Sequence, residues 1–209
     1  PILQHLKPQE NQRNSKIAFD VGPAPASHAP SVTSRGVQSQ ITGQRGDLII
    51  ADDAESLNNS ATSGMRDKLV TSTKEFEAVI KPEGRIVFLG TPQTEMSIYA
   101  SLPERGYDVK IWPARYPDAK TANNLGDRLA PKIREVMEAD EEMVGKPTDP
   151  DRFDDIDLME REASYGRTGF ALQFMLDTSL SDQDRYPLKL SDLIVMNLNP
   201  DNAPEKVIW

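Results

Sequence analysis

The chain has 209 residues and a formal net charge of −9, and its 37% apolar residues suffice for one large domain or a domain with a smaller appendage. It contains no cysteine, which excludes a disulfide framework and a thiolate metal site. The negative net charge argues against a protein that binds nucleic acid phosphates over its whole surface, although a local patch could still contact DNA. No apolar stretch approaches the roughly 18 residues of a membrane span and the start shows no signal-peptide pattern, so we expect no membrane partner.

The first third of the chain predicts short strands followed by one buried strand. The chain begins with Pro1 rather than methionine, and we expect an internal fragment or a processed product. Residues 16–21 and, more weakly, 31–34 are predicted as short strands. The apolar run 48–51 predicts a strand that is covered on both faces, as in a parallel sheet.

Helices and strands then alternate. Apolar residues at helical spacing predict a helix from about residue 58 to residue 80, ended by the segment 81–84. Residues 86–89 predict a second buried strand, a short helix capped by Thr94 follows, and residues 107–112 alternate as a third strand. This order predicts an α/β fold in which a mostly parallel sheet is flanked by helices, with right-handed crossovers.

The second half of the chain is acidic and poor in strand signals. We predict a helix bent at Pro131, an acidic loop, and helical stretches over 156–165 and 168–176. Two units are therefore expected: residues 1–117 hold the sheet, and residues 118–209 form a mainly helical linker or lid subdomain.

Two adjacent carboxylates, Asp52 and Asp53, directly follow the strand at 48–51. Parallel α/β sheets bind ligands outside the carboxyl ends of their strands. In enzymes that cleave nucleoside triphosphates, one carboxylate there holds Mg²⁺ and the next orients or deprotonates the attacking water. We assign Asp52 the first role and Asp53 the second, with both close to the metal ion. Molecular motors among these enzymes usually carry Glu at the second of the two positions, where this chain has Asp53. Glu55 is therefore a further candidate for activating the water. The alternative is an ordinary acidic turn.

A polar turn follows the strand at 86–89. Gly90 would let the backbone approach a ligand closely, and Pro92 would fix the turn. Thr91 and Gln93 offer a hydroxyl and an amide that could sense a γ-phosphate and pass its loss to moving parts. The alternative is a plain strand-to-helix loop.

Arginines and a missing motif complete the prediction. Arg35 and Arg45 flank the loop before the acidic strand, and either could stabilise charge during phosphoryl transfer across a subunit interface; the alternative is that both are simply solvated. A phosphate loop of the form Gly-x-x-x-x-Gly-Lys-Ser/Thr is needed ahead of the acidic strand, and no such run occurs. If the chain belongs to a motor that hydrolyses nucleoside triphosphates, that loop would lie upstream of Pro1.

Taken together, these residues resemble the large terminase subunit of tailed phages, particularly of the podovirus type. The matching segments occur in order along nearly the whole chain: 18–23, 40–43, 47–53 with Glu55, 59–62, 89–96, 111–114, 147–150 and 173–176.

The resemblance implies a P-loop NTPase fold of the ASCE type, with Walker B strand 47–53 and a coupling motif that includes Thr91 and Gln93. Residues 1–117 would be the later part of the ATPase domain, and residues 118–209 would lead to a nuclease domain. The implied cofactors are ATP and Mg²⁺. The implied partners are double-stranded DNA, the portal protein of the procapsid, the small terminase subunit and further copies in a homo-oligomeric ring. The protein would act in the host cytoplasm, transiently docked on the procapsid. The phosphate loop and the endonuclease would lie outside the chain, so we expect the isolated chain to be inactive.

Two other interpretations stay open. The chain could be a non-catalytic module that keeps an ATPase-like sheet and binds a partner through its acidic half. It could also belong to a helicase-like ATPase, since the run 60–62 imitates a helicase motif.

Overall fold

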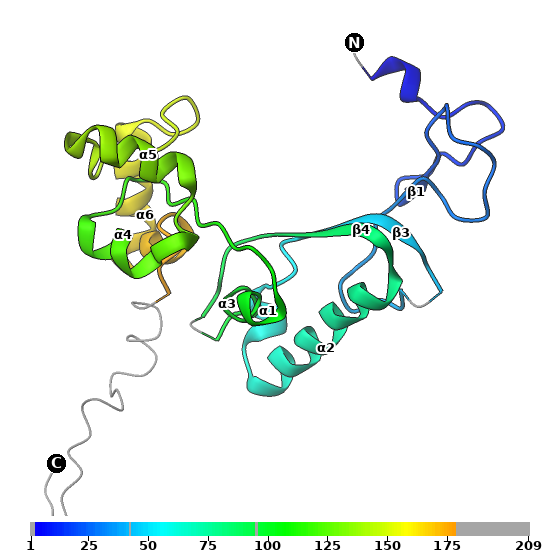
Figure 1. The fold of residues 1–209 in the computed structure, drawn as a ribbon, viewed down its shortest axis with the longest axis horizontal. Helices are drawn as coiled ribbons and strands as arrows, with labels where there is room; N and C mark the ends of the chain where they lie inside the picture. Colours follow the sequence, from blue (N-terminus) through cyan, green and yellow to red (C-terminus); the bar gives the residue numbers. More distant parts are fainter. Residues whose placement is uncertain (1–2, 42, 95, 179–209) are drawn as a thin grey trace, which may run out of the picture.

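The computed structural model describes residues 3–41, 43–94 and 96–178 (Figure 1). The last part of the predicted linker subdomain, residues 179–209, lies outside the described residues. The strands are β1 (Ala18–Phe19), β2 (Val32–Thr33), β3 (Gly46–Asp52) and β4 (Ile80–Leu89). The α-helices are α1 (Leu57–Ser60), α2 (Ser63–Val79), α3 (Ile98–Ser101), α4 (Ala119–Leu125), α5 (Pro131–Ala139) and α6 (Asp155–Gln173).

The centre of the fold is a parallel pair of strands, β3 and β4, connected through α2. Their register places Ala51 opposite Phe88 and Asp52 opposite Leu89, so both strands end at the same edge. Helices combined with a small parallel sheet confirm the predicted α/β class. The strands expected near the start also form, as the short antiparallel pair β1–β2.

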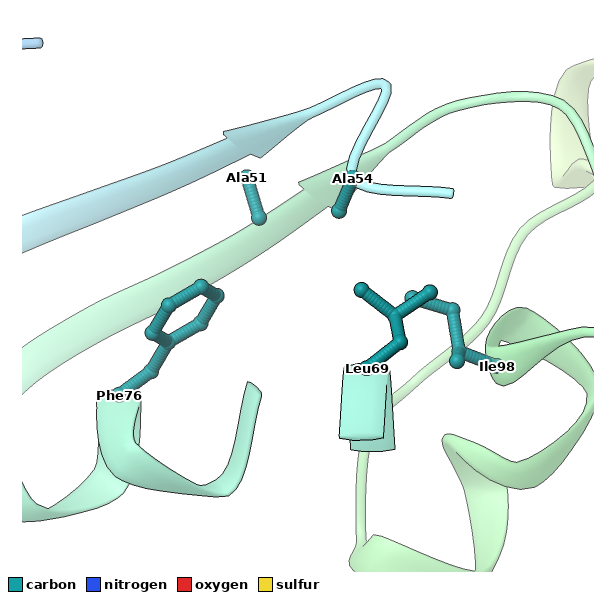
Figure 2. Packing of buried hydrophobic residues seen from close by; sticks show 5 residues of the cluster. All are labelled: Ala51, Ala54, Leu69, Phe76 and Ile98. Carbon is teal, nitrogen blue, oxygen red and sulfur yellow. The ribbon is translucent and has the colours of Figure 1, made fainter. Parts of the chain in front are cut away.

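One face of the β3–β4 sheet packs on helices. Ala51 and Ala54, at the end of β3 and just beyond it, face Leu69 and Phe76 of α2 and Ile98 of α3 (Figure 2). Leu69 is fully buried there, and the ring of Phe76 lies 5.9 Å from that of Phe88. Burial of these side chains, at roughly 25 cal/mol per Å² of apolar surface, holds the strand ends against the helices.

The other face of this sheet is open within the described part of the chain. Leu48 and Ile50 of β3 are 55% and 58% exposed, and Val87 and Leu89 of β4 are 39% and 51% exposed. The prediction that these apolar runs are covered on both faces is therefore wrong for the described residues, because α2 and α3 cover one face only.

The helix expected over 58–80 is divided. Ser56 forms a capping box with Asn59 at the start of α1, and the Thr62 hydroxyl accepts a bond from the Met65 N–H at the start of α2. Local side-chain caps at two nearby positions thus begin two helices. The chain then enters β4 at Ile80, so the residues expected only to end the helix belong to the strand.

Two predictions near the second strand end are wrong. Helix α3 is capped by Ser97, whose hydroxyl accepts from the Tyr99 N–H, and not by Thr94. Residues 107–112 form no strand in the sheet. Instead, the Ile111 N–H donates to the Arg128 carbonyl and the Ile111 carbonyl accepts from the Ala130 N–H, so this backbone bonds to the helical half.

The helical half has its own core. Tyr116, Leu129, Ala130 and Ile133 pack together, and Figure 1 shows α4, α5 and α6 gathered as one group. Pro131 opens α5 rather than bending a longer helix, since its missing N–H is tolerated in the first turn. The two helical stretches expected after residue 155 form α6, which is kinked where Gly166 has a φ of 69°.

Candidate functional site at the strand ends

The ends of β3 and β4 are joined by the backbone. Asp52 lies opposite Leu89, and the Asp53 N–H donates a hydrogen bond of 2.9 Å to the Leu89 carbonyl. The side chains of Asp52 and Asp53 are exposed at this edge. The structure therefore places the two carboxylates beside the start of the 90–93 turn.

Asp53 has an unusual backbone conformation, with a φ of 44°. Positive φ values are uncommon outside glycine, and Asp and Asn tolerate them best because their short polar side chains can bond locally. Backbone strain of this kind is concentrated at functional sites. The residue assigned to activate water is thus held in a conformation that few side chains adopt.

Glu55 lies two residues further on and is 3% exposed. Its Oε1 accepts from the Gln93 N–H at 3.0 Å, and its Oε2 accepts from the Ser97 hydroxyl at 2.7 Å and the Ile98 N–H at 2.8 Å. Its carboxylate is therefore turned toward the loop between β4 and α3.

Gly90 makes room for a side chain of this same site. A Cβ on Gly90 would lie 2.0 Å from the Tyr99 hydroxyl oxygen, closer than real Cβ contacts. That hydroxyl donates to the Leu89 carbonyl at 3.3 Å and accepts from the Glu55 N–H at 3.5 Å. Burial raises the pKa of the Tyr99 phenol, so it remains protonated and able to donate. In this structure, the close approach at Gly90 is made by Tyr99.

Thr91 and Gln93 are half-buried in the turn. The Gln93 side-chain amide donates to the Thr91 carbonyl at 3.1 Å, which closes the turn on itself. Thr91 also borders a cavity of about 660 Å³ whose other walls include Trp112, Lys132 and Phe174. The turn thus lies between the sheet and the helical half.

Both candidate arginines border a cavity beside β3. Arg35, Arg45 and Asp52 line one cavity of about 520 Å³, which runs along β3. The Arg45 guanidinium donates to the neighbouring Gln44 carbonyl at 2.8 Å. Arg45 directly precedes Gly46, where β3 begins, so at about 3.3 Å per residue it stands roughly 20 Å along the strand from Asp52, and the shared cavity does not bring it to the acidic strand end.

The donor set at this edge suits Mg²⁺ bound together with phosphates. Mg²⁺ is usually held by one or two carboxylates, with waters and substrate phosphates as its other ligands. Asp52 and Asp53 supply two exposed carboxylates. Within residues 3–41, 43–94 and 96–178, no group of three or more His, Cys, Asp or Glu side chains is placed to hold a metal ion.

Sequence reasoning missed Ser97 and Tyr99, which complete the hydrogen bonding of the two strand-end loops. Serine before a short apolar run is a helix-start signal, and Thr94 carries a similar signal three residues earlier. The structure leaves the Thr94 hydroxyl buried without a hydrogen-bond partner. No local pattern marks Tyr99, because its partners are 10 and 44 residues away along the chain.

Comparison with known proteins adds the family relationship. No model of a known protein family matches the chain. The chain is 52% identical to the terminase large subunit of Enterobacteria phage T3 over 214 aligned positions. This alignment covers 100% of the chain but only 36% of the phage T3 protein, so the chain spans about a third of its relative. Among the described residues, no helix combines the length and the apolar character needed to cross a bilayer. The chain is therefore similar, along its whole length, to about a third of the phage T3 terminase large subunit.

Proposed function

We propose that the chain forms part of an ATP-driven motor that moves double-stranded DNA into a viral procapsid. One structural observation carries this proposal: two exposed, adjacent carboxylates, Asp52 as the last residue of β3 and Asp53 directly after it, lie at the edge where the parallel strand β4 also ends. The relative from phage T3 is named as a terminase large subunit, which supports the same reading. Since the chain spans about a third of that relative, the activity is proposed for the whole gene product.

In this proposal, the ligands are ATP and Mg²⁺ in a P-loop NTPase fold. Asp52 contributes to the Mg²⁺ site, with Asp53 close to the same ion, and Asp53 orients and deprotonates the attacking water. Bound Mg²⁺ would neutralise charge on the phosphates during the transfer. The exposure of both carboxylates leaves them free to reach a ligand at the edge of the sheet.

The neighbouring loops would sense the nucleotide. Gly90, Thr91 and Gln93 would sense the loss of the γ-phosphate, and a role in passing it to the helical half is supported by the position of Thr91 on a cavity that Trp112 and Phe174 also line. Arg35 and Arg45 are the candidates for stabilising charge across a subunit interface.

The proposed division of the chain follows the same function. Residues 1–117 would belong to the ATPase domain with the Walker B strand, and residues 118–209 to the linker that leads to an endonuclease. The proposed partners are the portal protein, the small terminase subunit and further copies in a ring, and the proposed location is the host cytoplasm.

The test is ATP hydrolysis by the complete gene product in the presence of procapsids and DNA. Asp53→Asn keeps the shape and the tolerance of positive φ but removes the base, so hydrolysis should fall by about 10²-fold or more. Gln93→Ala should retain residual hydrolysis but lose DNA translocation. The matched control is Asp67→Asn, on an exposed position of α2, which should behave like the wild type. Hydrolysis by Asp53→Asn at the wild-type rate would refute the assigned role.

The second candidate is the non-catalytic module, which would bind a partner through the acidic half of the chain, where carboxylates are concentrated at 138–142 and 149–157. It predicts that the complete gene product neither binds nor hydrolyses ATP. The helicase-like alternative gains no support, because its candidate motif starts at Ser60 in α1 and not at a strand end.

A further inference from the structure

The Glu55 carboxylate joins two loops that the sequence places far apart. Its three donors, Gln93, Ser97 and Ile98, come 38 to 43 residues later in the chain. Two of these donors are backbone N–H groups and the third is a hydroxyl, so the carboxylate acts as the acceptor in all three bonds.

This arrangement leaves Glu55 poorly suited to deprotonate a water. A general base must reach its proton directly or through one water. Both oxygens of Glu55 are already occupied by protein donors, and the residue is 3% exposed. Asp53, by contrast, is exposed at the sheet edge.

The backbone around Glu55 is fixed as firmly as its side chain. The Asn59 side chain accepts from the Ser56 N–H at 2.8 Å and donates to the Ala54 carbonyl at 2.9 Å, which ties the segment to α1. The Tyr99 hydroxyl lies between the Glu55 N–H and the Leu89 carbonyl. A displacement of the Asp53 turn would therefore be transmitted through Glu55 to Gln93 and to the start of α3.

We propose that Glu55 is a positioning residue that mechanically joins the Asp52–Asp53 turn to the Gln93 loop, and that it does not activate the attacking water. The part that concerns ATP and DNA rests on the proposed function. The joining of the two loops does not, and it can be tested separately.

The first experiment measures hydrogen exchange of the Gln93 and Ile98 amides by NMR. Glu55→Gln replaces one carboxylate oxygen by an amide donor, so either the Gln93 or the Ile98 amide loses its acceptor and should exchange about tenfold faster or more, equivalent to ~1.4 kcal/mol. Ser97→Ala removes one donor but keeps the carboxylate, and should speed exchange at Ile98 less. The control Glu75→Gln, at an exposed position of α2, should change neither amide. Unchanged exchange in both Glu55→Gln and Ser97→Ala would overturn the proposal.

The second experiment uses the complete gene product with procapsids and measures ATP hydrolysed and DNA length moved. Glu55→Gln should reduce hydrolysis by less than about tenfold while sharply lowering the DNA moved per ATP, whereas Asp53→Asn should reduce hydrolysis by about 10²-fold or more. Ser97→Ala should lower the same ratio, and adding it to Glu55→Gln should cause little further loss, because both variants break one connection. Hydrolysis by Glu55→Gln as low as that of Asp53→Asn would overturn the proposal.

The two experiments separate two kinds of failure. If the wild-type protein hydrolyses no ATP, the proposed function fails, and the exchange rates still decide whether Glu55 joins the loops. If hydrolysis is normal but the exchange rates do not respond, the proposed function survives and the role of Glu55 does not.

Discussion

Replacing Gly90 by alanine tests whether Tyr99 occupies the strand-end turn as the structure shows. The added Cβ would lie 2.0 Å from the Tyr99 hydroxyl oxygen and 2.6 Å from Cζ, whereas contacts below 3.0 Å are essentially never seen. The Tyr99 side chain would have to move by about 1 Å, the difference between 3.0 and 2.0 Å, and would lose its bonds to Leu89 and Glu55. Overpacking, the loss of two long hydrogen bonds and the backbone strain of an alanine at a φ of 158° together should lower the free energy of unfolding by about 3–5 kcal/mol.

Urea unfolding followed by circular dichroism measures this loss from the transition midpoint. Gly64→Ala is the matched control, because no atom lies within 4 Å of its added Cβ in helix α2. That variant should gain about 0.5–1 kcal/mol from helix propensity. In a Tyr99→Ala background, Gly90→Ala should cost only about 1–2 kcal/mol, since the collision is gone and only the backbone strain at a φ of 158° remains. Two results would refute the reasoning: a Gly90→Ala variant as stable as Gly64→Ala, or an equal loss in the Tyr99→Ala background.

Three further predictions concern the supporting structure. Leu69→Ala removes a fully buried side chain beneath the sheet and should cost about 2–5 kcal/mol by urea unfolding, whereas Met65→Ala on the exposed side of α2 should stay within about 0.5 kcal/mol. Arg105→Lys should lower the free energy of unfolding by about 1–2 kcal/mol in the same assay. The planar guanidinium of Arg105 bonds two residues of α2 and lies beside two aromatic rings, and a lysine ammonium cannot keep all of these contacts. An unchanged midpoint would contradict this. The pKa of Asp118 lies below its ordinary value because its carboxylate accepts hydrogen bonds from Thr121. The stabilisation of α4 by this cap is therefore fully present above the ordinary Asp pKa and is lost as the pH falls through the lowered pKa of Asp118. An NMR titration of the Asp118 carboxyl carbon should show the lowered pKa. A titration midpoint at or above the ordinary value would count against the cap.

The sequence predicted the strand ends well because their signals are local. An apolar run followed by Asp52 and Asp53 marks the end of β3, and a similar run before Gly90 marks the end of β4. Parallel pairing then brings the two ends to one edge by general rules of sheet topology, as the register of Asp52 with Leu89 shows. The α/β class followed from the same alternation of elements.

The contacts between the loops could not be predicted, since they depend on partners far along the chain. Glu55 bonds residues about 40 positions later, and no pattern around it distinguishes a buried carboxylate from one that faces water. The segment 107–112 has the alternation of a strand, yet its backbone bonds to the helical half instead. The assignments of Mg²⁺, of the attacking water and of the two arginines remain predictions.

The bare face of the β3–β4 sheet has a practical consequence for handling the chain. An apolar ridge on this sheet is exposed to solvent and consists of Leu48, Ile50, Val87 and Leu89. Parallel sheets are normally covered by other elements on both faces. At the protein concentrations used for crystallisation or NMR, exposed apolar surfaces of this kind promote association and aggregation. Polar substitutions at Leu48 and Val87 should reduce this aggregation without disturbing the core, because those side chains point away from the core that supports the strand ends.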